Sequence, residues 1–150
     1  KGMFQKTFSG CGSLKTIPSG LFDGISGDAA DSMFSSTFSG CTGLTSIPEN
    51  LFAGISGWPA NSMFSGTFED CSGLTSIPEK LFGNMNNYPQ TYMFKDTFKG
   101  CTGLTGPSAR INNKPLYDYF LTLVNSSWGS GCYRGATGLS DYSSIPSKMK

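Results

Sequence analysis

A set of apolar residues that recurs every 30 residues constrains the fold of this chain more than any other feature. Its members are Phe, Cys and Leu side chains at fixed spacing within each unit: Phe8, Phe38, Phe68 and Phe98; Cys11, Cys41, Cys71 and Cys101; and Leu14, Leu44, Leu74 and Leu104. One unit has too few apolar residues to enclose its own core, so it must pack on its neighbours. The period therefore predicts a solenoid of units stacked in register.

Within a unit, the pattern predicts one short strand and short helical segments. Residues 44–47 lie between Gly43 and Pro48, which favours a strand that ends at the proline. Within residues 61–68, the side chains Met63, Phe64, Thr67 and Phe68 recur at i, i+1, i+4 and i+5, which favours a helical turn on the convex side. We predict an α/β class: a curved stack of coils with one short parallel strand per coil.

The string T-F-x-x-C-x-x-L-x-x-I-P, as at residues 37–48, resembles the BspA-like branch of bacterial leucine-rich repeats, whose units carry A-F-x-x-C-x-x-L-x-x-I. The resemblance covers roughly residues 3–105, although Thr replaces Ala before the Phe and the unit is several residues longer. It implies a leucine-rich-repeat solenoid in a secreted or surface-anchored bacterial protein that mediates adhesion to host proteins, other cells or matrix. It also implies an extracellular or bacterial cell-surface location.

The repeat units start near residues 3, 33, 63 and 93, which assigns residues 1–106 to the leucine-rich repeats. Residues 107–150 depart from the pattern: a helix is predicted over 114–125, and a degenerate unit returns at residues 135–146. We predict that this part is a C-terminal cap, with an inserted ligand-binding segment as the alternative. Because the chain opens at Lys1 inside a repeat, we expect it to be the C-terminal piece of a longer exported protein.

Composition argues against several classes of function. The net charge of +1 leaves no electrostatic footprint for nucleic acid, and no apolar run approaches the roughly 20 residues of a membrane helix. The chain has no histidine, so Ser–His and Cys–His nucleophile pairs and histidine metal ligands are excluded. We expect a protein that is not an enzyme, requires no cofactor or metal, binds no nucleic acid and has no membrane span in this chain.

The cysteines and carboxylates also favour structural roles. Stacking would place successive cysteines about 4.8 Å apart with parallel side chains, whereas disulfides prefer Cβ atoms roughly 3.8 Å apart. We therefore expect a buried ladder of free thiols, with Cys132 aligned to the position of Thr97. The acidic cluster Asp23, Asp28 and Asp31 would suit calcium, yet it does not recur in the second unit, so a solvated loop is favoured.

Binding residues are expected among the positions that vary between repeats. Trp58 and Tyr88 occupy the same repeat position, and Tyr92 lies in the same variable tail, so they could serve as protein hot spots or stack on sugar rings. Alternatively, they only cover the edge of the coil. Thr45 and Thr75 would lie on the strand face and could donate hydrogen bonds to a partner or simply face water.

We predict a module for protein–protein interaction or adhesion. The alternative is a carbohydrate-binding surface protein that uses the exposed aromatic residues, so the predicted partner is a protein or a glycan.

Overall fold

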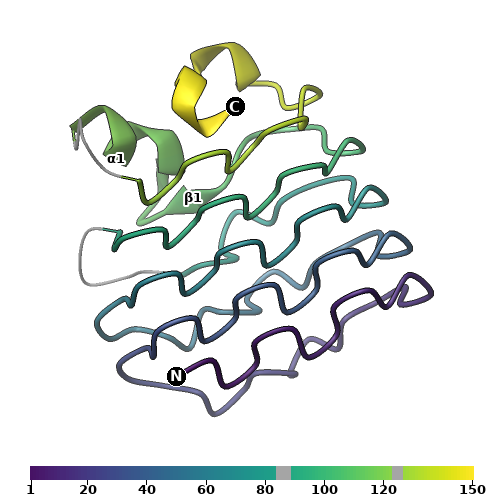
Figure 1. The fold of residues 1–150 in the computed structure, drawn as a ribbon, viewed down its shortest axis with the longest axis vertical. Helices are drawn as coiled ribbons and strands as arrows, with labels where there is room; N and C mark the ends of the chain where they lie inside the picture. The colour runs from purple at the N-terminus through teal and green to yellow at the C-terminus, as the bar shows by residue number, and fades with distance from the viewer. Residues whose placement is uncertain (84–88, 123–126) are drawn as a thin grey trace.

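The chain winds into successive turns that lie one above another from the N-terminus to the C-terminus (Figure 1). The computed structural model describes residues 1–83, 89–122 and 127–150. Backbone N–H groups of one turn donate to carbonyls 29 residues further along, as from Phe34 to Met63 at 2.9 Å. Between Phe94 and Trp128 the offset is 34 residues, at 2.7 Å, because extra residues precede the last turn. Each turn is thus one sequence repeat, and neighbouring repeats are in register.

The repeats contact each other along the Met-Phe-x-x-Thr-Phe segment, where N–H groups alternate between two kinds of acceptor. In residues 62–70, the even-numbered residues, such as Phe64, donate to carbonyls of the next repeat at 2.7–2.9 Å. The odd-numbered residues from 65 to 69, such as Thr67, donate to the carbonyl three residues back at 3.1 Å. An α-helix instead sends every N–H to the carbonyl four residues back. The segment predicted as a helical turn is therefore a chain of tight turns with a hydrogen-bonded edge.

Left-handed backbone at every fourth residue accompanies this alternation. In the third repeat the positions are Ser62, Gly66 and Asp70, with φ of 53°, 62° and 58°. The first, second and fourth repeats have positive φ at the same three positions. Glycine and short polar residues tolerate this region best, which accounts for the Ser, Gly and Asp found at most of these positions. Regular helix or strand periodicity cannot persist through a segment with this backbone.

The predicted strand at residues 44–47 has no regular secondary structure. One backbone hydrogen bond joins it to the preceding repeat, from the Thr45 N–H to the Lys15 carbonyl at 3.4 Å. The equivalent bonds at Thr75 and Thr105 measure 3.4 and 2.9 Å. A parallel strand pair has evenly spaced bonds along its length, and good N–H···O bonds are near 2.9–3.0 Å. The backbone hydrogen bonds between repeats are therefore formed mainly by the Met-Phe-x-x-Thr-Phe turn segments, and few are formed by the predicted strands.

Among the described residues, helices and strands occur only near the C-terminus. They are β1 (Arg110–Ile111), β2 (Lys114–Pro115), α1 (Leu116–Thr122) and two 3-10 helices, η1 (Tyr142–Ser144) and η2 (Ser147–Met149). β1 and β2 form an antiparallel hairpin, so Lys114 and Pro115 belong to this hairpin and do not open the predicted helix. α1 lies within the predicted 114–125 range, and residues 123–125 are outside the described residues.

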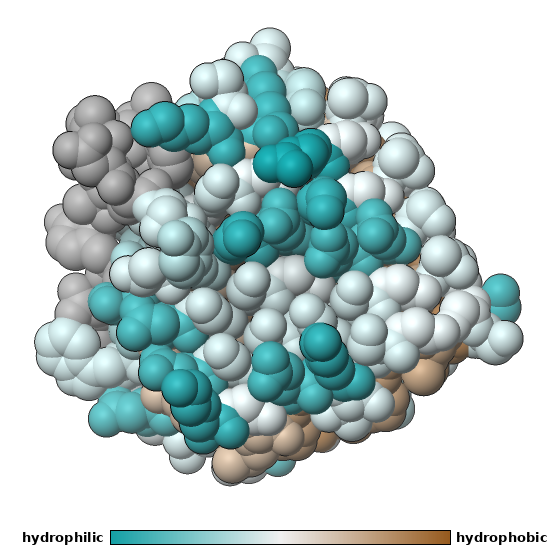
Figure 2. Space-filling view, viewed as in Figure 1, coloured by the Kyte–Doolittle hydropathy of each residue, from teal (hydrophilic) through white to brown (hydrophobic). Residues whose placement is uncertain are grey.

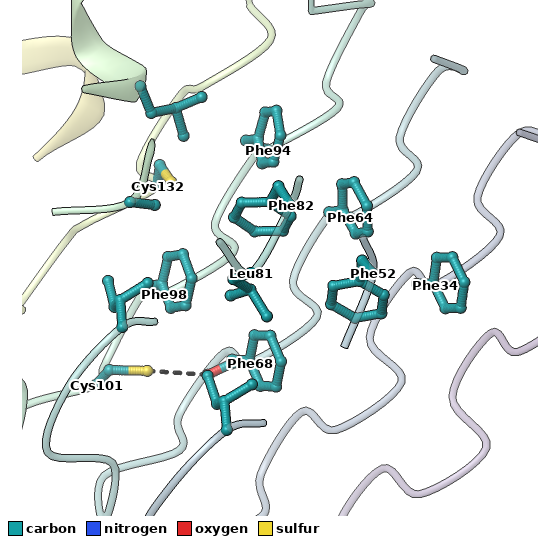
Figure 3. Packing of buried hydrophobic residues seen from close by; sticks show 14 of the residues in the cluster. Phe34, Phe52, Phe64, Phe68, Leu81, Phe82, Phe94, Phe98, Cys101 and Cys132 are labelled. Atoms are coloured by element: carbon teal, nitrogen blue, oxygen red, sulfur yellow. Dashed lines mark hydrogen bonds between the residues drawn. The ribbon is translucent and has the colours of Figure 1, made fainter. Parts of the chain in front are cut away.

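The core consists of columns of aromatic rings that run through the stack (Figure 3). Phe38, Phe68 and Phe98 stack with centroids 5.5 and 5.7 Å apart, and Tyr133 continues this column at 5.9 Å. Neighbouring columns meet at tilted angles, as between Phe52 and Phe64 at 4.9 Å. Stacked and tilted aromatic pairs each contribute about 0.5–1.5 kcal/mol beyond the burial of their area. The recurring phenylalanines therefore join each repeat to both of its neighbours.

A threonine of the second, third and fourth repeats lies buried between these columns. The Thr67 hydroxyl lies 2.8 Å from the Phe64 carbonyl of its own repeat and 2.9 Å from the Phe34 carbonyl of the preceding repeat. Thr37 and Thr97 occupy the equivalent position and are also fully buried. Alanine, which the BspA-like pattern has at this position, could not donate to either carbonyl. In each Thr–Phe pair, the threonine thus forms a hydrogen bond to the preceding repeat, and the adjacent phenylalanine stacks on the rings of the neighbouring repeats.

The C-terminal residues take the place that a following repeat would occupy. The N–H groups of Gly131 and Tyr133 in the last turn donate to the carbonyls of Lys148 and Met149 at 2.8 and 2.7 Å. Met149 is fully buried. Ser108 is also joined to this region, because its hydroxyl donates to the Asp141 carboxylate at 2.8 Å. That residues 107–150 act as a C-terminal cap stays a prediction.

We expect Phe68→Ala to lower the free energy of unfolding by about 3–5 kcal/mol, because the ring is fully buried and stacks on both sides. Phe8→Ala should cost roughly half as much or less, because Phe8 is half-buried and stacks only on Phe38. Urea denaturation followed by circular dichroism measures both. Equal losses at the two positions would contradict the nearest-neighbour stacking described above.

Candidate functional site

Trp58 is the most exposed aromatic side chain of the described residues, at 62%. Its backbone is nevertheless fixed to the preceding repeat. The Trp58 N–H donates to Asp28 Oδ1 at 2.9 Å, and its carbonyl accepts the Ala29 N–H at 3.0 Å. The indole is thus displayed from a hydrogen-bonded backbone, which lowers the entropy lost when a partner binds it.

Tyr92, the second predicted contact residue, is 45% exposed. It has a left-handed backbone with φ of 54°, and Lys95 Nζ lies 5.4 Å from the centroid of its ring. This is the geometry of a cation–π contact, which orients the ring at the surface. Tyr88 lies outside the described residues, so its stacking with Trp58 remains a prediction.

On the predicted threonine face, the hydroxyls of Thr75 and Thr105 donate within the molecule. Thr45 and Thr75 are exposed, but the Thr75 hydroxyl lies 3.4 Å from the Thr45 carbonyl. The Thr105 hydroxyl makes the equivalent bond to the Thr75 carbonyl at 3.1 Å. A hydroxyl that donates in this way still offers lone pairs to a partner. At Thr75 and Thr105 the face therefore offers a partner hydrogen-bond acceptors in place of hydroxyl donors.

Two of the three acidic residues of the first repeat, Asp28 and Asp31, accept hydrogen bonds from backbone N–H groups of the second repeat. Asp28 accepts from Trp58, and Asp31 Oδ1 accepts the Asn61 N–H at 3.2 Å. No group of three or more potential metal-ligating side chains occurs in residues 1–83, 89–122 and 127–150. Asp28 and Asp31 therefore have a structural role in joining the first two repeats.

A polar cleft of about 470 Å³ is a feature that the sequence analysis missed. Its lining comes from the second repeat, the third repeat and the β1–β2 hairpin: Asn50, Ala53, Ser56, Glu79, Lys80, Gly83, Asn112 and Asn113. Both hairpin asparagines have left-handed backbone, with φ of 50° and 62°. Two consecutive Asn residues favour such a tight hairpin turn, and this signal could have revealed the hairpin. Cleft volumes of several hundred Å³ are typical of sites for small ligands.

The thiol ladder is not a nucleophilic site. Cys41, Cys71 and Cys101 are fully buried, and each Sγ lies 3.0–3.1 Å from a Phe carbonyl of the preceding repeat. Burial raises the pKa of the Cys71 thiol to about 12, and it also raises the pKa of Cys101 and of buried Cys132. Only the thiolate is nucleophilic, so these cysteines are inert at neutral pH. Cys11, in contrast, is exposed.

None of the helices in the described ranges combines the length and apolar character that crossing a lipid bilayer requires.

Comparison of the chain with protein-family models, with curated proteins and with solved structures gives no match. The repeat pattern and the geometry of the surface therefore carry the functional inference.

Thiol labelling of the native protein should modify Cys11 alone, because the other four cysteines are buried and protonated. Ellman's reagent at pH 7.5 is expected to titrate one thiol in the folded protein and five after denaturation in guanidinium. Cys11→Ser should remove the native signal. Rapid labelling of a second thiol in the folded protein would contradict the buried ladder.

The free energy of unfolding should fall as pH rises above about 9. The Cys71 thiol keeps its proton in the folded protein up to a pKa of about 12, whereas in the unfolded chain it ionises near its ordinary value of 9.0. Between these values this thiol contributes a slope of up to about −1.4 kcal/mol per pH unit, and it contributes no slope below that window. Urea titrations at pH 8 to 11 measure the slope, and Cys71→Ala should make it shallower. An unchanged slope in that variant would contradict the assignment.

Proposed function

We propose that this chain is a non-catalytic leucine-rich-repeat module, similar to the BspA-like proteins. It binds another protein through exposed aromatic side chains at positions that vary between repeats. The observation that carries the proposal is the exposure of Trp58, 62%, on a backbone that is hydrogen-bonded to the preceding repeat. Tryptophan is strongly enriched among the residues that dominate protein–protein binding energy. Tyr92 adds a second exposed aromatic side chain from the same variable tail of the repeat.

The solenoid assignment draws support from the register of the repeats. Backbone hydrogen bonds join equivalent positions of successive turns, and the Leu positions Leu44, Leu74 and Leu104 are fully buried. Each repeat thus contributes packing residues to a shared core, as leucine-rich repeats do. The resemblance of the repeat pattern implies a secreted or cell-surface bacterial protein, and we include that location in the proposal.

The proposal of a non-catalytic role follows from the state of the reactive groups. The buried thiols are protonated, histidine is absent, and Asp28 and Asp31 bind backbone N–H groups. General acid–base chemistry would need groups that titrate near neutral pH in a cleft. The charged residues that line the polar cleft are Glu79, which is acidic, and Lys80, which is basic.

A carbohydrate ligand is the second candidate. An exposed indole can stack on a sugar ring, and the cleft that Asn50, Asn112 and Asn113 line offers amide groups of the kind that bind hydroxyls. This candidate would require the aromatic edge or the cleft to recognise a glycan in place of a protein surface.

Trp58→Ala should weaken protein binding at least tenfold, because truncation of a central aromatic anchor costs about 2 kcal/mol or more. Biolayer interferometry of the whole chain against a panel of purified extracellular-matrix and cell-surface proteins tests this. Met3→Ser is the matched control, because Met3 is equally exposed, at 66%, but belongs to the first repeat. We expect it to leave the affinity unchanged.

A glycan array with the same variants separates the two candidates. Glycan binding that Trp58→Ala abolishes, without any protein ligand, would support the carbohydrate candidate. Turnover of a glycoside or peptide by the purified chain would contradict a non-catalytic role.

A further inference from the structure

The edge of the stack that carries Trp58 lies in an acidic part of the chain. Residues 16–79 contain seven acidic residues and no Lys or Arg, whereas residues 80–150 contain three acidic and eight basic residues. The variable tails at residues 26–32 and 56–62 form this edge, in purple to blue at the lower left of Figure 1. Below the grey atoms, the left edge of Figure 2 is mainly teal to pale, and the brown area lies along the lower edge of the view. A partner of Trp58 therefore meets a polar surface in a negatively charged part of the molecule.

The carboxylate of Asp28 is held beside Trp58 by the pairing of these two tails. The Gly57 N–H donates to the Gly27 carbonyl at 3.1 Å, and the Ala29 N–H donates to the Trp58 carbonyl at 3.0 Å. Between these two bonds, Asp28 Oδ1 accepts the Trp58 N–H at 2.9 Å. A Cβ atom at position 57 would overlap with Asp28 Oδ1 and with the Gly27 backbone, so this close approach requires glycine. Contacts between the first and second repeats thus fix the carboxylate next to the exposed indole.

The negative charges of this edge have no cationic partner among the described residues. Asp28 is exposed, and its second oxygen, Oδ2, accepts no hydrogen bond from them. Asp31, whose Oδ1 accepts the Asn61 N–H at 3.2 Å, adds a second carboxylate to the same edge. The salt bridge that the described residues form joins Lys99 to Glu69 at 2.6 Å and involves neither aspartate. Both charges therefore remain for a cation that a partner supplies.

An aromatic side chain of a later variable tail already contacts a cation within the chain. Lys95 Nζ lies 5.4 Å from the centroid of the Tyr92 ring. The other cation–π contact of the described residues uses Tyr142, so neither contact uses Trp58. Among aromatic side chains, an indole attracts cations most strongly. Trp58 is therefore suited to a cation from outside the chain.

We propose that Trp58 and Asp28 together bind an arginine side chain in a basic segment of the partner protein. The planar guanidinium stacks on the indole and donates N–H groups to the carboxylate. Lysine carries a compact charge without a planar face, so it fits less well. The negative charge of residues 16–79 attracts such a segment and accelerates its association. This inference rests on the proposed function, because it states which chemistry of a protein surface Trp58 contacts.

The test is a titration of the whole protein with peptides that have blocked termini, followed by the indole N–H signals in two-dimensional NMR. One peptide carries several arginines separated by glycine and serine. Its matched control carries citrulline, which keeps the shape of arginine without the charge. The two tryptophans of the chain are Trp58 at the surface and Trp128 in the core, and Trp58→Ala assigns their signals.

We expect the arginine peptide to shift the Trp58 signal saturably and to leave the Trp128 signal unchanged. The citrulline peptide should bind about tenfold more weakly, because it loses both the cation–π contact and the ion pair. A peptide with lysine in place of arginine should bind about threefold more weakly.

Asp28→Asn isolates the contribution of the charge. The amide oxygen of asparagine can still accept the Trp58 N–H, so the pairing of the tails is kept. We expect the arginine peptide to bind this variant about threefold more weakly at low salt, with a smaller difference at high salt. Asp118→Asn is the matched control, because Asp118 is also exposed but lies in α1. It should leave the affinity unchanged.

Circular dichroism establishes that each variant is folded. The inference is overturned if the arginine peptide does not shift the Trp58 signal, if the citrulline peptide binds equally well, or if Asp28→Asn leaves binding unchanged. Binding of a whole protein that Trp58→Ala weakens and Asp28→Asn does not would keep the proposed function and overturn the arginine contact. Binding of the arginine peptide at Trp58, without any protein ligand that depends on Trp58, would support the arginine contact and contradict the proposed function.

Discussion

The alternate N–H groups of the turn segments are the interaction on which the rest of the structure depends. In residues 62–70 each even-numbered N–H leaves its own repeat and reaches the next one, while the odd-numbered groups from 65 to 69 close local turns. These two kinds of hydrogen bond pair the backbone donors of the segment without a helix or a sheet. Pairing matters because a buried backbone N–H group without an acceptor destabilises the folded state. It also fixes the register at which the aromatic rings of neighbouring repeats meet.

The side chains then reinforce the register that the backbone sets. The single proton of the Thr67 hydroxyl lies within reach of a carbonyl of its own repeat and one of the preceding repeat, and the Cys71 thiol lies next to the Phe38 carbonyl. Both groups are buried between columns of phenylalanine, where a hydrogen bond is strong and an unpaired polar atom is costly. Because every contact joins neighbouring repeats only, stability approximates a sum of terms between neighbours.

The 30-residue period allowed the packing residues to be predicted, because large apolar side chains at a fixed spacing have few other means of burial. Phe38, Phe68, Cys41 and Cys71 are all fully or almost fully buried. The turn segments were not predicted, because apolar side chains at i, i+1, i+4 and i+5 suit a helix and a chain of tight turns alike. The distinguishing signal was the four-residue spacing of left-handed positions, such as Ser62 and Gly66.

One of the candidate sites could be predicted from the sequence, and the other could not. The exposure of Trp58 follows from its place in a repeat position that varies, where nothing in the core requires an aromatic side chain. The polar cleft combines Asn50 and Glu79 with Asn112 and Asn113 of a hairpin that has no counterpart in the repeats. Such a juxtaposition arises from tertiary contacts, and periodicity contains no information about it.

The backbone hydrogen bonds that the Met-Phe-x-x-Thr-Phe segments form between repeats all point in one direction, because the donors of each segment reach acceptors that lie later in the chain. Translation delivers the residues in that same order. When a segment such as residues 32–40 is synthesised, the carbonyls that accept its outward N–H groups in the folded protein, among them those of Met63 and Thr67, have not yet been made. Each segment therefore obtains its native acceptors only after the following repeat is synthesised, and those of the last turn are the carbonyls of Lys148 and Met149.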